Sequence, residues 1–323
     1  MERSVLVVGG RGYIGRRLNE YLRTYGYKVV SLDIGWFPAI TDSGIEDWVG
    51  DVRDIGPEDV RGFYGVCFLA STAMPDHERR LRFYDAYVAN FDGLVNLVQC
   101  CKRVGVERLT LASTTSVLGY VARGNGVDET HVPEPDERYG EVKLICETYL
   151  RRERCGRFHP VILRQGTVYG VSPRMRFDLV VNAMVKTAFK EKKIYIFGDR
   201  DLCRPLVYIG DVCEAHRLSL ERAPRFSGEV FHLAYGSYTL GEIAEIVRRV
   251  TGAKIVEGFK SADRRSYRAT TLKVRRWLFQ PQVSVEMGAK EVLRALKMGK
   301  IEDPDSDIYY NSRYLPTLVG KEE

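Results

Sequence analysis

Tyr139 and Lys143 form a Y-x-x-x-K pair within a stretch of helical character. Residues four apart on a helix share one face, so the phenol and the ammonium project into the same space. A phenol has an ordinary pKa of about 10, and a nearby cation lowers that pKa by stabilising the phenolate. Such a pair can act as a general acid/base on an alcohol or a ketone. Tyr and Lys are also common on helix surfaces, so the surrounding sequence has to indicate what the pair would act on.

A glycine-rich segment near the N-terminus supplies a second chemical signal. The apolar run Val5–Val8 leads directly into Gly9-Gly10-Arg11-Gly12-Tyr13-Ile14-Gly15, and residues 16–22 follow with helical apolar spacing. Glycines at a strand-to-helix turn permit a tight turn, close approach of the backbone to a pyrophosphate, and a phosphate at the helix N-terminus. The segment therefore predicts a dinucleotide site that includes Gly9, Gly12, Tyr13, Ile14 and Gly15.

Asp33 ends the second apolar run. Its distance in sequence from the glycine loop is close to the offset of about 20 residues at which an acid hydrogen-bonds an adenosine ribose. Its carboxylate would repel a 2'-phosphate, so NAD is favoured over NADP. A simple turn residue would look the same at this position. Asp51 is a second acid that could lie beside the adenine, although a loop cap fits the same pattern.

Strand candidates and helix candidates alternate along the first half of the chain. Residues 65–70 form an apolar run, residues 84–103 have helical spacing, and residues 108–112 form the next apolar run. This alternation indicates βαβ units, so the predicted fold is α/β, a Rossmann-type doubly wound parallel sheet. The small residues Ser71-Thr72-Ala73 that follow residues 65–70 suit a backbone that passes close to a flat cofactor. We therefore add Leu69, Ala70 and Ser71, at the end of this strand, to the predicted cofactor site.

Four consecutive hydroxyl residues, Ser113 to Ser116, follow the run at 108–112. Ligands of doubly wound sheets bind outside the carboxyl ends of the strands, so these hydroxyls are well placed to contact one. A hydrogen-bonded turn is the alternative explanation.

Composition and charge argue against several other classes of protein. The 323 residues are 45% hydrophobic and 28% charged, which is ordinary for a soluble globular protein. No apolar run reaches the length of a transmembrane helix, and the chain enters its first strand too early for a signal peptide, so we expect a cytoplasmic protein. Seven scattered cysteines predict neither a metal site nor a disulfide framework. The net charge of +6 fits a solvated surface or attraction of an anionic ligand, and no basic run with aromatics indicates nucleic acid.

The order of these motifs resembles the extended short-chain dehydrogenase/reductases, specifically the NAD-dependent nucleotide-sugar epimerase/dehydratase family with UDP-glucose 4-epimerase as its type. The matching segments run through nearly the whole chain: the glycine loop, Asp33, Asp51-Val52-Arg53, Asn90, Ser113–Gly119, Tyr139–Lys143, Ile162–Arg164, Val168–Gly170, Gly198-Asp199, Arg204–Ile209, Asp211-Val212 and Phe231–Leu233. The resemblance implies bound NAD, contacted by the cofactor residues named above together with Val52, Asn90 and Lys143.

The resemblance also implies catalytic roles. Tyr139 would be the acid/base, and Lys143 would lower its pKa while hydrogen-bonding the nicotinamide ribose. Thr114 matches the family hydroxyl that touches the reacting sugar oxygen. Leu118 departs from the family pattern, because that position usually holds a tyrosine.

A nucleotide sugar is the substrate that the resemblance implies. Arg204 matches the family arginine that binds its phosphate, although a surface ion pair is the alternative, and Arg264 or Arg265 resembles the second phosphate ligand. Asn182 looks like a substrate contact. Thr167 stands where many members have asparagine, which leaves the identity of the sugar open. With these residues we place Thr114, Thr115 and Tyr139 in the predicted substrate site.

We expect an NAD-binding domain at residues 1–170 plus about 205–235, and a smaller substrate-binding domain at about 171–204 and 236–323. Residues 205–208 should return to the first domain as a strand, and helices are expected at 178–190, 239–247 and 285–296. The tail from Asp303 to Glu323 would either pack on the core or fray. Family members commonly dimerise through two helices that include the Tyr-Lys helix, so the resemblance suggests a homodimer.

These observations favour two functions and argue against two others. The first is an NAD-dependent C4 epimerase of a UDP-hexose, and the second is a dehydrogenase or reductase of the same fold with net NAD(H) turnover. A 4,6-dehydratase is disfavoured, because the family places an Asp-Glu pair where Thr115-Ser116 stand. A non-catalytic binding protein would predict a damaged Tyr/Lys pair, and this pair is intact.

Overall fold

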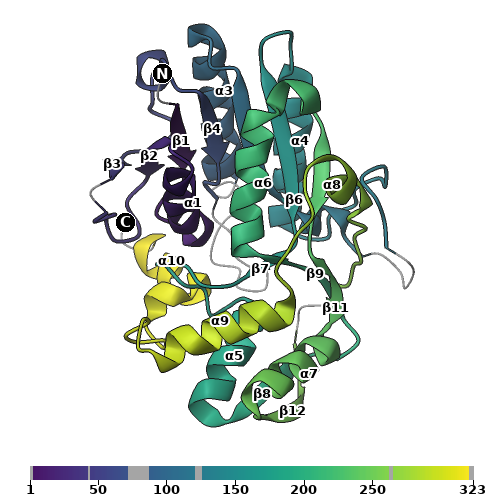
Figure 1. The fold of residues 1–323 in the computed structure, drawn as a ribbon. Coiled ribbons are helices and arrows are strands. Elements are labelled where there is room, and N and C mark those ends of the chain that lie inside the picture. Colours follow the sequence, from purple (N-terminus) through teal and green to yellow (C-terminus); the bar gives the residue numbers. More distant parts are fainter. Residues whose placement is uncertain (1–2, 43, 72–86, 121–125, 262–264, 320–323) are drawn as a thin grey trace.

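A seven-stranded parallel sheet forms the larger lobe in the described part of the chain (Figure 1). The computed structural model describes residues 3–42, 44–71, 87–120, 126–261 and 265–319. The strand order is β10-β6-β5-β4-β1-β2-β3, and all the pairings are parallel. The order reverses between β1 and β4, which is where doubly wound sheets bind their ligands. The prediction of a Rossmann-type sheet is confirmed. The strands are β1 (Ser4–Val8), β2 (Lys28–Asp33), β3 (Ile45–Val49), β4 (Gly65–Phe68), β5 (Arg108–Thr114), β6 (His159–Gln165) and β10 (Val230–Leu233).

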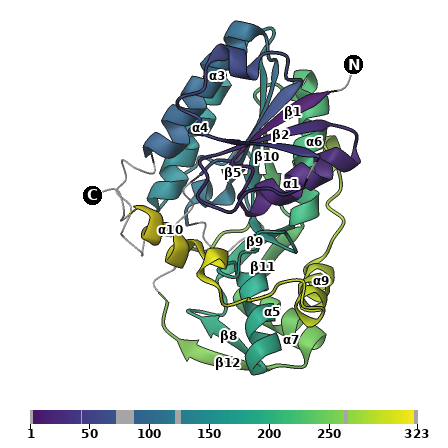
Figure 2. The ribbon, with the colours of Figure 1, turned by 90° about the vertical axis from the view of Figure 1, so that its left-hand side faces the viewer.

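Helices cover both faces of this sheet (Figure 2). The helices α1 (Tyr13–Thr24) and α6 (Ile209–Glu221) pack together on one face, and α3 (Gly93–Val104) and α4 (Arg138–Glu153) lie on the other. Because both faces are covered, the central strands are apolar throughout, as the runs in the sequence indicate. Shorter helical turns lie at Pro57–Val60, Val88–Asp92, Thr115–Leu118, Ala223–Phe226 and Asp307–Tyr309.

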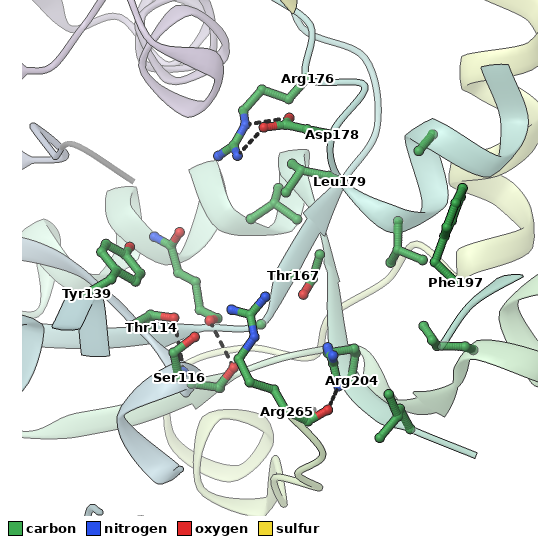
Figure 3. A pocket seen from close by; sticks show the side chains of 18 of the residues that line it. Thr114, Ser116, Tyr139, Thr167, Arg176, Asp178, Leu179, Phe197, Arg204 and Arg265 are labelled. Atoms are coloured by element: carbon green, nitrogen blue, oxygen red, sulfur yellow. Dashed lines mark hydrogen bonds and ion pairs between the residues drawn. The ribbon is translucent and has the colours of Figure 1, made fainter. Parts of the chain in front are cut away.

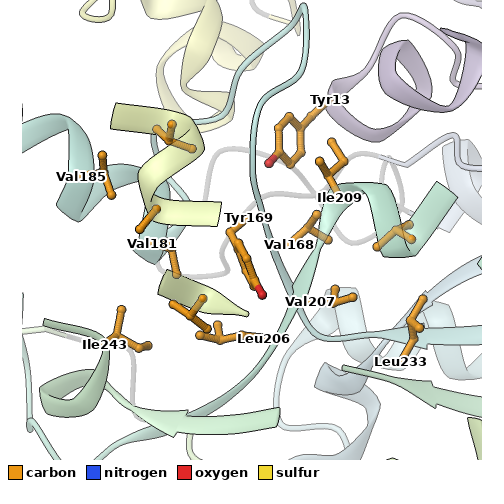
Figure 4. Close-up of a cluster of buried hydrophobic side chains, with 14 of the residues drawn as sticks. Tyr13, Val168, Tyr169, Val181, Val185, Leu206, Val207, Ile209, Leu233 and Ile243 are labelled. Carbon is orange, nitrogen blue, oxygen red and sulfur yellow. The ribbon is translucent and has the colours of Figure 1, made fainter. Parts of the chain in front are cut away.

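The smaller lobe combines two small sheets with helices. Its elements are β7 (Thr167–Tyr169), β9 (Cys203–Tyr208) and β11 (Gly236–Thr239) in one sheet, β8 (Lys193–Phe197) and β12 (Lys254–Phe259) in the other, and α5 (Val180–Glu191), α7 (Leu240–Thr251) and α9 (Val285–Lys297). A capping box between Thr239 and Glu242 begins α7. Figure 4 shows Tyr169 and Leu206 packed in the apolar cluster that joins the two lobes.

The strand expected to return to the dinucleotide lobe does not join the large sheet. Residues 205–208 lie in β9, which pairs with β7 and β11. The return is made instead by α6 and then by β10, which pairs with β6. Tyr267 and Ala269 also pack back against Val117 and Leu118 next to β5, before α8 (Leu272–Trp277). The chain therefore crosses between the lobes more often than the sequence alone indicates.

The C-terminal segment contacts both lobes (Figure 2). Asp305 forms ion pairs with Lys186 and Lys190 of α5. Tyr314 of α10 (Asn311–Val319) stacks on Phe37, which follows β2, with ring centroids 5.6 Å apart. Of the two outcomes expected for the tail, packing on the core is the one found for residues 303–319.

A buried ion pair fastens α4 to the sheet. Arg164 of β6 donates to both carboxylate oxygens of Glu147 at 2.7 to 3.0 Å, and Ser113 of β5 donates to the same carboxylate at 2.5 Å. Glu147 and Arg164 are almost completely buried. Removing one partner would leave the other charge buried without compensation.

We therefore predict that Glu147→Ala lowers the free energy of unfolding by about 3 to 5 kcal/mol. Urea unfolding followed by circular dichroism measures the change. Glu153→Ala is the control, because Glu153 pairs with Lys102 on the solvent side of the same helix, and a change of about 0 to 1 kcal/mol is expected there. Equal losses in the two variants would contradict the prediction.

Candidate active site

A cavity of about 500 Å³ lies between the two lobes. It is lined by residues from α1, the turn after β5, the start of α4, the 165–168 segment, α5, β8, β9 and α10. Figure 3 shows Tyr139 and Thr114 next to each other on one side, Phe197 on the opposite side, and Thr167 between them. Of the predicted site residues, the cavity brings together Tyr13, Ile14, Thr114, Thr115, Tyr139, Thr167, Arg204 and Arg265.

Tyr139 and Lys143 lie on successive turns at the start of α4. The Lys143 ammonium lies 5.8 Å from the centroid of the Tyr139 ring. The Lys143 side chain is only 1% exposed, and burial lowers the pKa of its ammonium, against the attraction of Cys146 and Glu147. The helix thus presents both groups on one side, as the spacing predicts.

Burial is the largest influence on the pKa of the Tyr139 phenol. It raises the pKa of the phenol to about 12, because the phenolate is poorly solvated away from water. Arg176 is the largest of the effects that lower this pKa, followed by a hydrogen bond with Ser71, while Glu137 and Tyr267 raise it. The ligand-free site therefore holds Tyr139 as a neutral phenol at neutral pH, which differs from the lowered pKa expected from Lys143.

The hydroxyl residues at the end of β5 form a hydrogen-bonded turn, and they also line the cavity. Ser116 N donates to Thr114 Oγ1 at 3.1 Å, which caps the short helix Thr115–Leu118, and Thr115 donates to the backbone oxygen of Gln165 at 3.3 Å. Ser116 and Tyr267 hydroxyls lie 3.3 Å apart. These residues therefore form the predicted turn and also line the cavity, and their contact with a ligand stays a prediction. Leu118 is buried in an apolar cluster with Tyr267, outside the cavity lining.

The glycine loop has the close packing that a pyrophosphate site requires. A Cβ on Gly9 would lie 2.6 Å from the backbone nitrogen of Ala70, and one on Gly15 would lie 2.3 Å from the backbone oxygen of Gly9. Gly9 also has a positive φ of 85°. Gly12 is the N-cap of α1 without a side-chain capping bond, so the helix N-terminus presents its backbone N–H groups at the loop. These residues fit a dinucleotide diphosphate.

Asp33 lies beside this loop. Arg11 N and Gly35 N donate to its two carboxylate oxygens at 3.0 Å each. Burial raises the pKa of the Asp33 carboxyl, and the two backbone N–H groups and the Arg11 guanidinium oppose that rise. Arg11 itself pairs with Asp47 through Nε and Nη2, at 3.2 and 2.7 Å. The Asp33 carboxylate lies beside the loop and would repel a 2'-phosphate, and Arg11 is already paired with Asp47. The loop is therefore suited to NAD rather than to NADP.

Other predicted cofactor residues lie around the ends of β1, β3 and β4, outside the cavity lining. Asp51 pairs with Arg53, which lowers the pKa of its carboxyl, and Val52 is buried in the core. Leu69, Ala70 and Ser71 follow β4 and are half-buried. Asn90 is buried, and its backbone oxygen accepts from Cys146.

The predicted substrate residues separate into two groups. Arg204 and Arg265 both line the cavity, and Arg204 donates to the backbone oxygen of Arg265. Arg264 lies outside the described residues. Asn182 is fully buried: it accepts from Gly170 N at 3.1 Å and donates to the Tyr13 hydroxyl at 3.2 Å. The hydrogen bonds of its amide hold the loop between β7 and α5 in place, and Asn182 is not part of the cavity lining. Its position therefore does not support the predicted substrate contact.

Several cavity residues were not singled out by the sequence patterns. Arg176 and Asp178 form a bidentate ion pair, and Arg265 pairs with Glu137 at 2.8 Å. Tyr267 contributes its phenol from a segment far along the chain. The sequence signal for the first pair is an Arg-x-Asp in an otherwise apolar segment, but its spacing does not reveal which side of the loop faces the cavity.

Comparison with known proteins identifies the family. The model of the NAD dependent epimerase/dehydratase family matches residues 5–234, more than half of the chain. The chain belongs to this family. NAD is therefore its cofactor, which confirms the prediction from the glycine loop and Asp33. Within the described residues, no helix is long and apolar enough to cross a membrane.

Relatives of the epimerase/dehydratase family align along most of the chain. A putative UDP-glucose 4-epimerase of Methanocaldococcus jannaschii is 25% identical, with 91% of this chain and 98% of that protein covered. The structure of Thermus thermophilus UDP-glucose 4-epimerase in complex with NAD is 27% identical, with a TM-score of 0.76 over 91% of this chain and 99% of the other. A dTDP-glucose 4,6-dehydratase from Streptomyces venezuelae shares the fold at 24% identity, with a TM-score of 0.80 over 92% and 98% of the chains. The family contains both epimerases and dehydratases.

We predict that Gly15→Ala weakens NAD binding by at least about tenfold, or about 1.4 kcal/mol. The added methyl would overlap the backbone of Gly9 and push the loop out of its diphosphate-binding shape. NAD released by denaturation, and titration of the cofactor-free protein by calorimetry, measure the effect. Gly156→Ala is the control, because a Cβ there meets no atom within 4 Å. Unchanged NAD affinity in Gly15→Ala would contradict the assigned loop.

Proposed function

We propose that the protein is an NAD-dependent nucleotide-sugar epimerase that inverts C4 of a UDP-hexose through a transient 4-keto intermediate. The observation that carries the proposal is the shared cavity, which holds Tyr139 and Thr114 together with Arg204 and Arg265. The first two residues suit an alcohol, and the two arginines suit a diphosphate. Similarity to relatives named UDP-glucose 4-epimerase supports the same substrate class.

At the reacting end, we assign Tyr139 as the acid/base. Its phenolate would take the proton of the C4 hydroxyl while the C4 hydrogen leaves as hydride, which converts the alcohol to a ketone. Bound NAD supplies the hydride acceptor, and the donor for the return step in an epimerase. Tyr139 then returns the proton to the sugar oxygen, and Thr114 Oγ1 orients that oxygen. Rotation of the ketone between the two half-reactions gives the inverted product.

At the far end, we assign Arg204 and Arg265 to the diphosphate. Their planar forks can each donate two hydrogen bonds to phosphate oxygens. Aromatic side chains of β8, Tyr195 and Phe197, also line the cavity and offer flat surfaces for a nucleotide base. Tyr139 and Phe197 lie on opposite sides of the cavity (Figure 3), so we place the sugar beside Tyr139 and the base beside Phe197, with the diphosphate between them.

Elimination of water is disfavoured as the reaction. Among the described residues, the cavity is lined by two carboxylates, Asp178 and Glu137, which pair with Arg176 and Arg265. The Thr115 hydroxyl donates a hydrogen bond to the backbone oxygen of Gln165. These groups do not match the acid and base that a dehydratase of this family uses. The homodimer through two helices that include α4, which carries the Tyr/Lys pair, and the cytoplasmic location stay predictions.

The purified protein is expected to carry NAD and to interconvert UDP-glucose and UDP-galactose without added cofactor. Separation of the two nucleotide sugars by chromatography measures this reaction. A nucleotide-sugar dehydrogenase or reductase, which uses the same Tyr/Lys pair, would instead change the absorbance of NADH in proportion to the substrate consumed. That result would replace the epimerase by the oxidoreductase.

Tyr139→Phe is expected to reduce turnover by about 10²- to 10⁴-fold, because it removes the group that transfers the proton. The NAD content should stay unchanged, since the phenyl ring keeps the volume of the side chain. Tyr149→Phe is the matched control: it lies on the same helix, but its hydroxyl bonds to Gln99 of α3. Wild-type turnover of Tyr139→Phe would remove the acid/base assignment.

A further inference from the structure

Gln165 is the last residue of β6, at the edge of the large sheet that borders the cavity. Its side chain is almost completely buried, yet the residue lines the cavity. In the parallel pairing of β5 with β6, Gln165 lies directly beside Thr114. Its backbone oxygen accepts a hydrogen bond from the Thr115 hydroxyl at 3.3 Å. These contacts fix the backbone of Gln165 next to the turn after β5, and no step of the proposed reaction uses its side chain.

A buried chain of polar groups holds the amide of Gln165. Its Nε2 lies 3.1 Å from Nε2 of His216 on α6, and His216 Nδ1 lies 2.7 Å from Oγ1 of Thr110 in β5. His216 and Thr110 are both completely enclosed. Burial lowers the pKa of the His216 imidazole to about 3, so the ring is neutral and has one donor and one acceptor nitrogen.

The directions of these hydrogen bonds follow from the neutral ring. An amide nitrogen donates and does not accept, so His216 Nε2 accepts from Gln165 and the Nδ1–H donates to Thr110. The hydroxyl hydrogen of Thr110 then remains for Cys67. Burial raises the pKa of the Cys67 thiol, and a hydrogen bond with Thr110 opposes that rise. All the donors along this chain therefore point away from the cavity.

The same chain leaves the amide oxygen of Gln165 available to a ligand. Among the described residues, Gln165 Oε1 has no hydrogen-bond partner, and it is not one of the fully enclosed polar atoms that lack a partner. Because Gln165 lines the cavity and its amide nitrogen is directed to His216, the oxygen is the atom that a ligand in the cavity can reach. The site thus offers a carbonyl acceptor in a fixed orientation.

The sheet places this acceptor on the nicotinamide half of the cofactor site. A doubly wound sheet binds a dinucleotide across the ends of its strands, with one nucleotide over each half of the strand order. Asp33, which we assign to the adenosine ribose, ends β2. The other nucleotide then lies over the ends of β4, β5 and β6, and Gln165 ends β6. Ile14 of the glycine loop lines the same cavity, which therefore extends from that loop to the end of β6.

The contact with His216 also shows on which face of the sheet the Gln165 side chain lies. His216 belongs to α6, whereas Tyr139 belongs to α4 on the opposite face. An acceptor on the α6 side is suited to a group of the cofactor rather than to the hydroxyl that reacts at Tyr139. The nicotinamide carries a carboxamide, whose NH₂ group is a donor that matches a carbonyl oxygen.

We propose that Gln165 is a cofactor-binding residue whose Oε1 accepts a hydrogen bond from the carboxamide NH₂ of the nicotinamide. His216 and Thr110 hold the amide so that its oxygen, and not its nitrogen, meets the carboxamide. A fixed acceptor restricts rotation of the nicotinamide ring about its bond to the ribose, and so selects the ring face that is turned to the substrate. The inference depends on NAD as the cofactor and does not rest on the proposed epimerase reaction.

The test compares NAD with 3-acetylpyridine adenine dinucleotide, in which a methyl group replaces the carboxamide NH₂ and the donor is lost. Each is titrated into the cofactor-free protein by calorimetry. We expect the wild-type protein to bind the analogue about three- to tenfold more weakly than NAD, as for the loss of one hydrogen bond. Equal affinities overturn the proposal, and this measurement needs no variant.

The Gln165→Met variant shows whether Gln165 makes that hydrogen bond, because methionine keeps the length of the side chain and has no amide. The variant should bind NAD and the analogue with equal affinity. If it keeps the wild-type preference for NAD, another group accepts from the carboxamide and the proposal is overturned. Gln99→Met is the matched control, since the Gln99 amide donates to Tyr149 outside the cavity lining. Loss of the preference in this control also overturns the proposal.

ADP-ribose separates a direct contact from damage to the fold. It has no nicotinamide, so the wild-type protein and Gln165→Met should bind it equally. If the variant loses as much affinity for ADP-ribose as for NAD, Gln165 has a structural role and the proposal is overturned.

A contact of Gln165 with the sugar is the alternative that turnover excludes. In that case Gln165→Met would raise the KM for the nucleotide sugar while it kept the preference for NAD over the analogue, which overturns the proposal. The binding measurements use no sugar. Loss of the NAD preference in Gln165→Met, together with absent epimerase activity in the wild-type protein, would therefore reject the proposed reaction and retain the role of Gln165.

Discussion

An ammonium almost without access to water lies on α4, one turn behind the Tyr139 that lines the cavity. Lys143 is fully enclosed, and a buried cation keeps its charge only when nearby groups compensate for the lost hydration. Burial lowers the pKa of the Lys143 ammonium, and Cys146 and then Glu147, one helical turn further along α4, oppose that effect in part. Arg164 of β6 and Ser113 of β5 hold the Glu147 carboxylate in place, so the two strands position one of the acids that favour the charged lysine. Moving α4 relative to the sheet would expose or unpair several charges at once.

Three arginines in and beside the cavity are paired with carboxylates. Arg176 pairs with Asp178, Arg265 with Glu137, and Arg11 with Asp47 at the cofactor loop. The site therefore does not attract an anionic ligand by excess charge alone. In the proposed function, recognition would rely on the direction of guanidinium forks, which suits a ligand whose phosphates occupy fixed positions. The modest net charge of +6 is consistent with this arrangement.

Local patterns in the sequence account for the parts of the fold that depend on neighbouring residues. The run Val5–Val8, the glycine loop and the helical spacing after it predict β1, the cofactor turn and α1, because each signal lies within a few residues. The partner of a strand is set by the whole chain, so the pairing of β9 with β7 and β11 is not encoded in residues 205–208 alone. The same limit explains Arg176: its sequence neighbourhood gives the ion pair, but only the folded chain places it across from Tyr139.

The C-terminal segment at residues 303–319 ties the larger lobe to the smaller lobe next to the cavity. Tyr314 holds Phe37 on one side, and Asp305 holds Lys186 and Lys190 on the other. Separating the lobes at this place would cost the ring stack or the ion pairs. The end of the chain therefore joins the two lobes through side chains that lie outside the cavity lining.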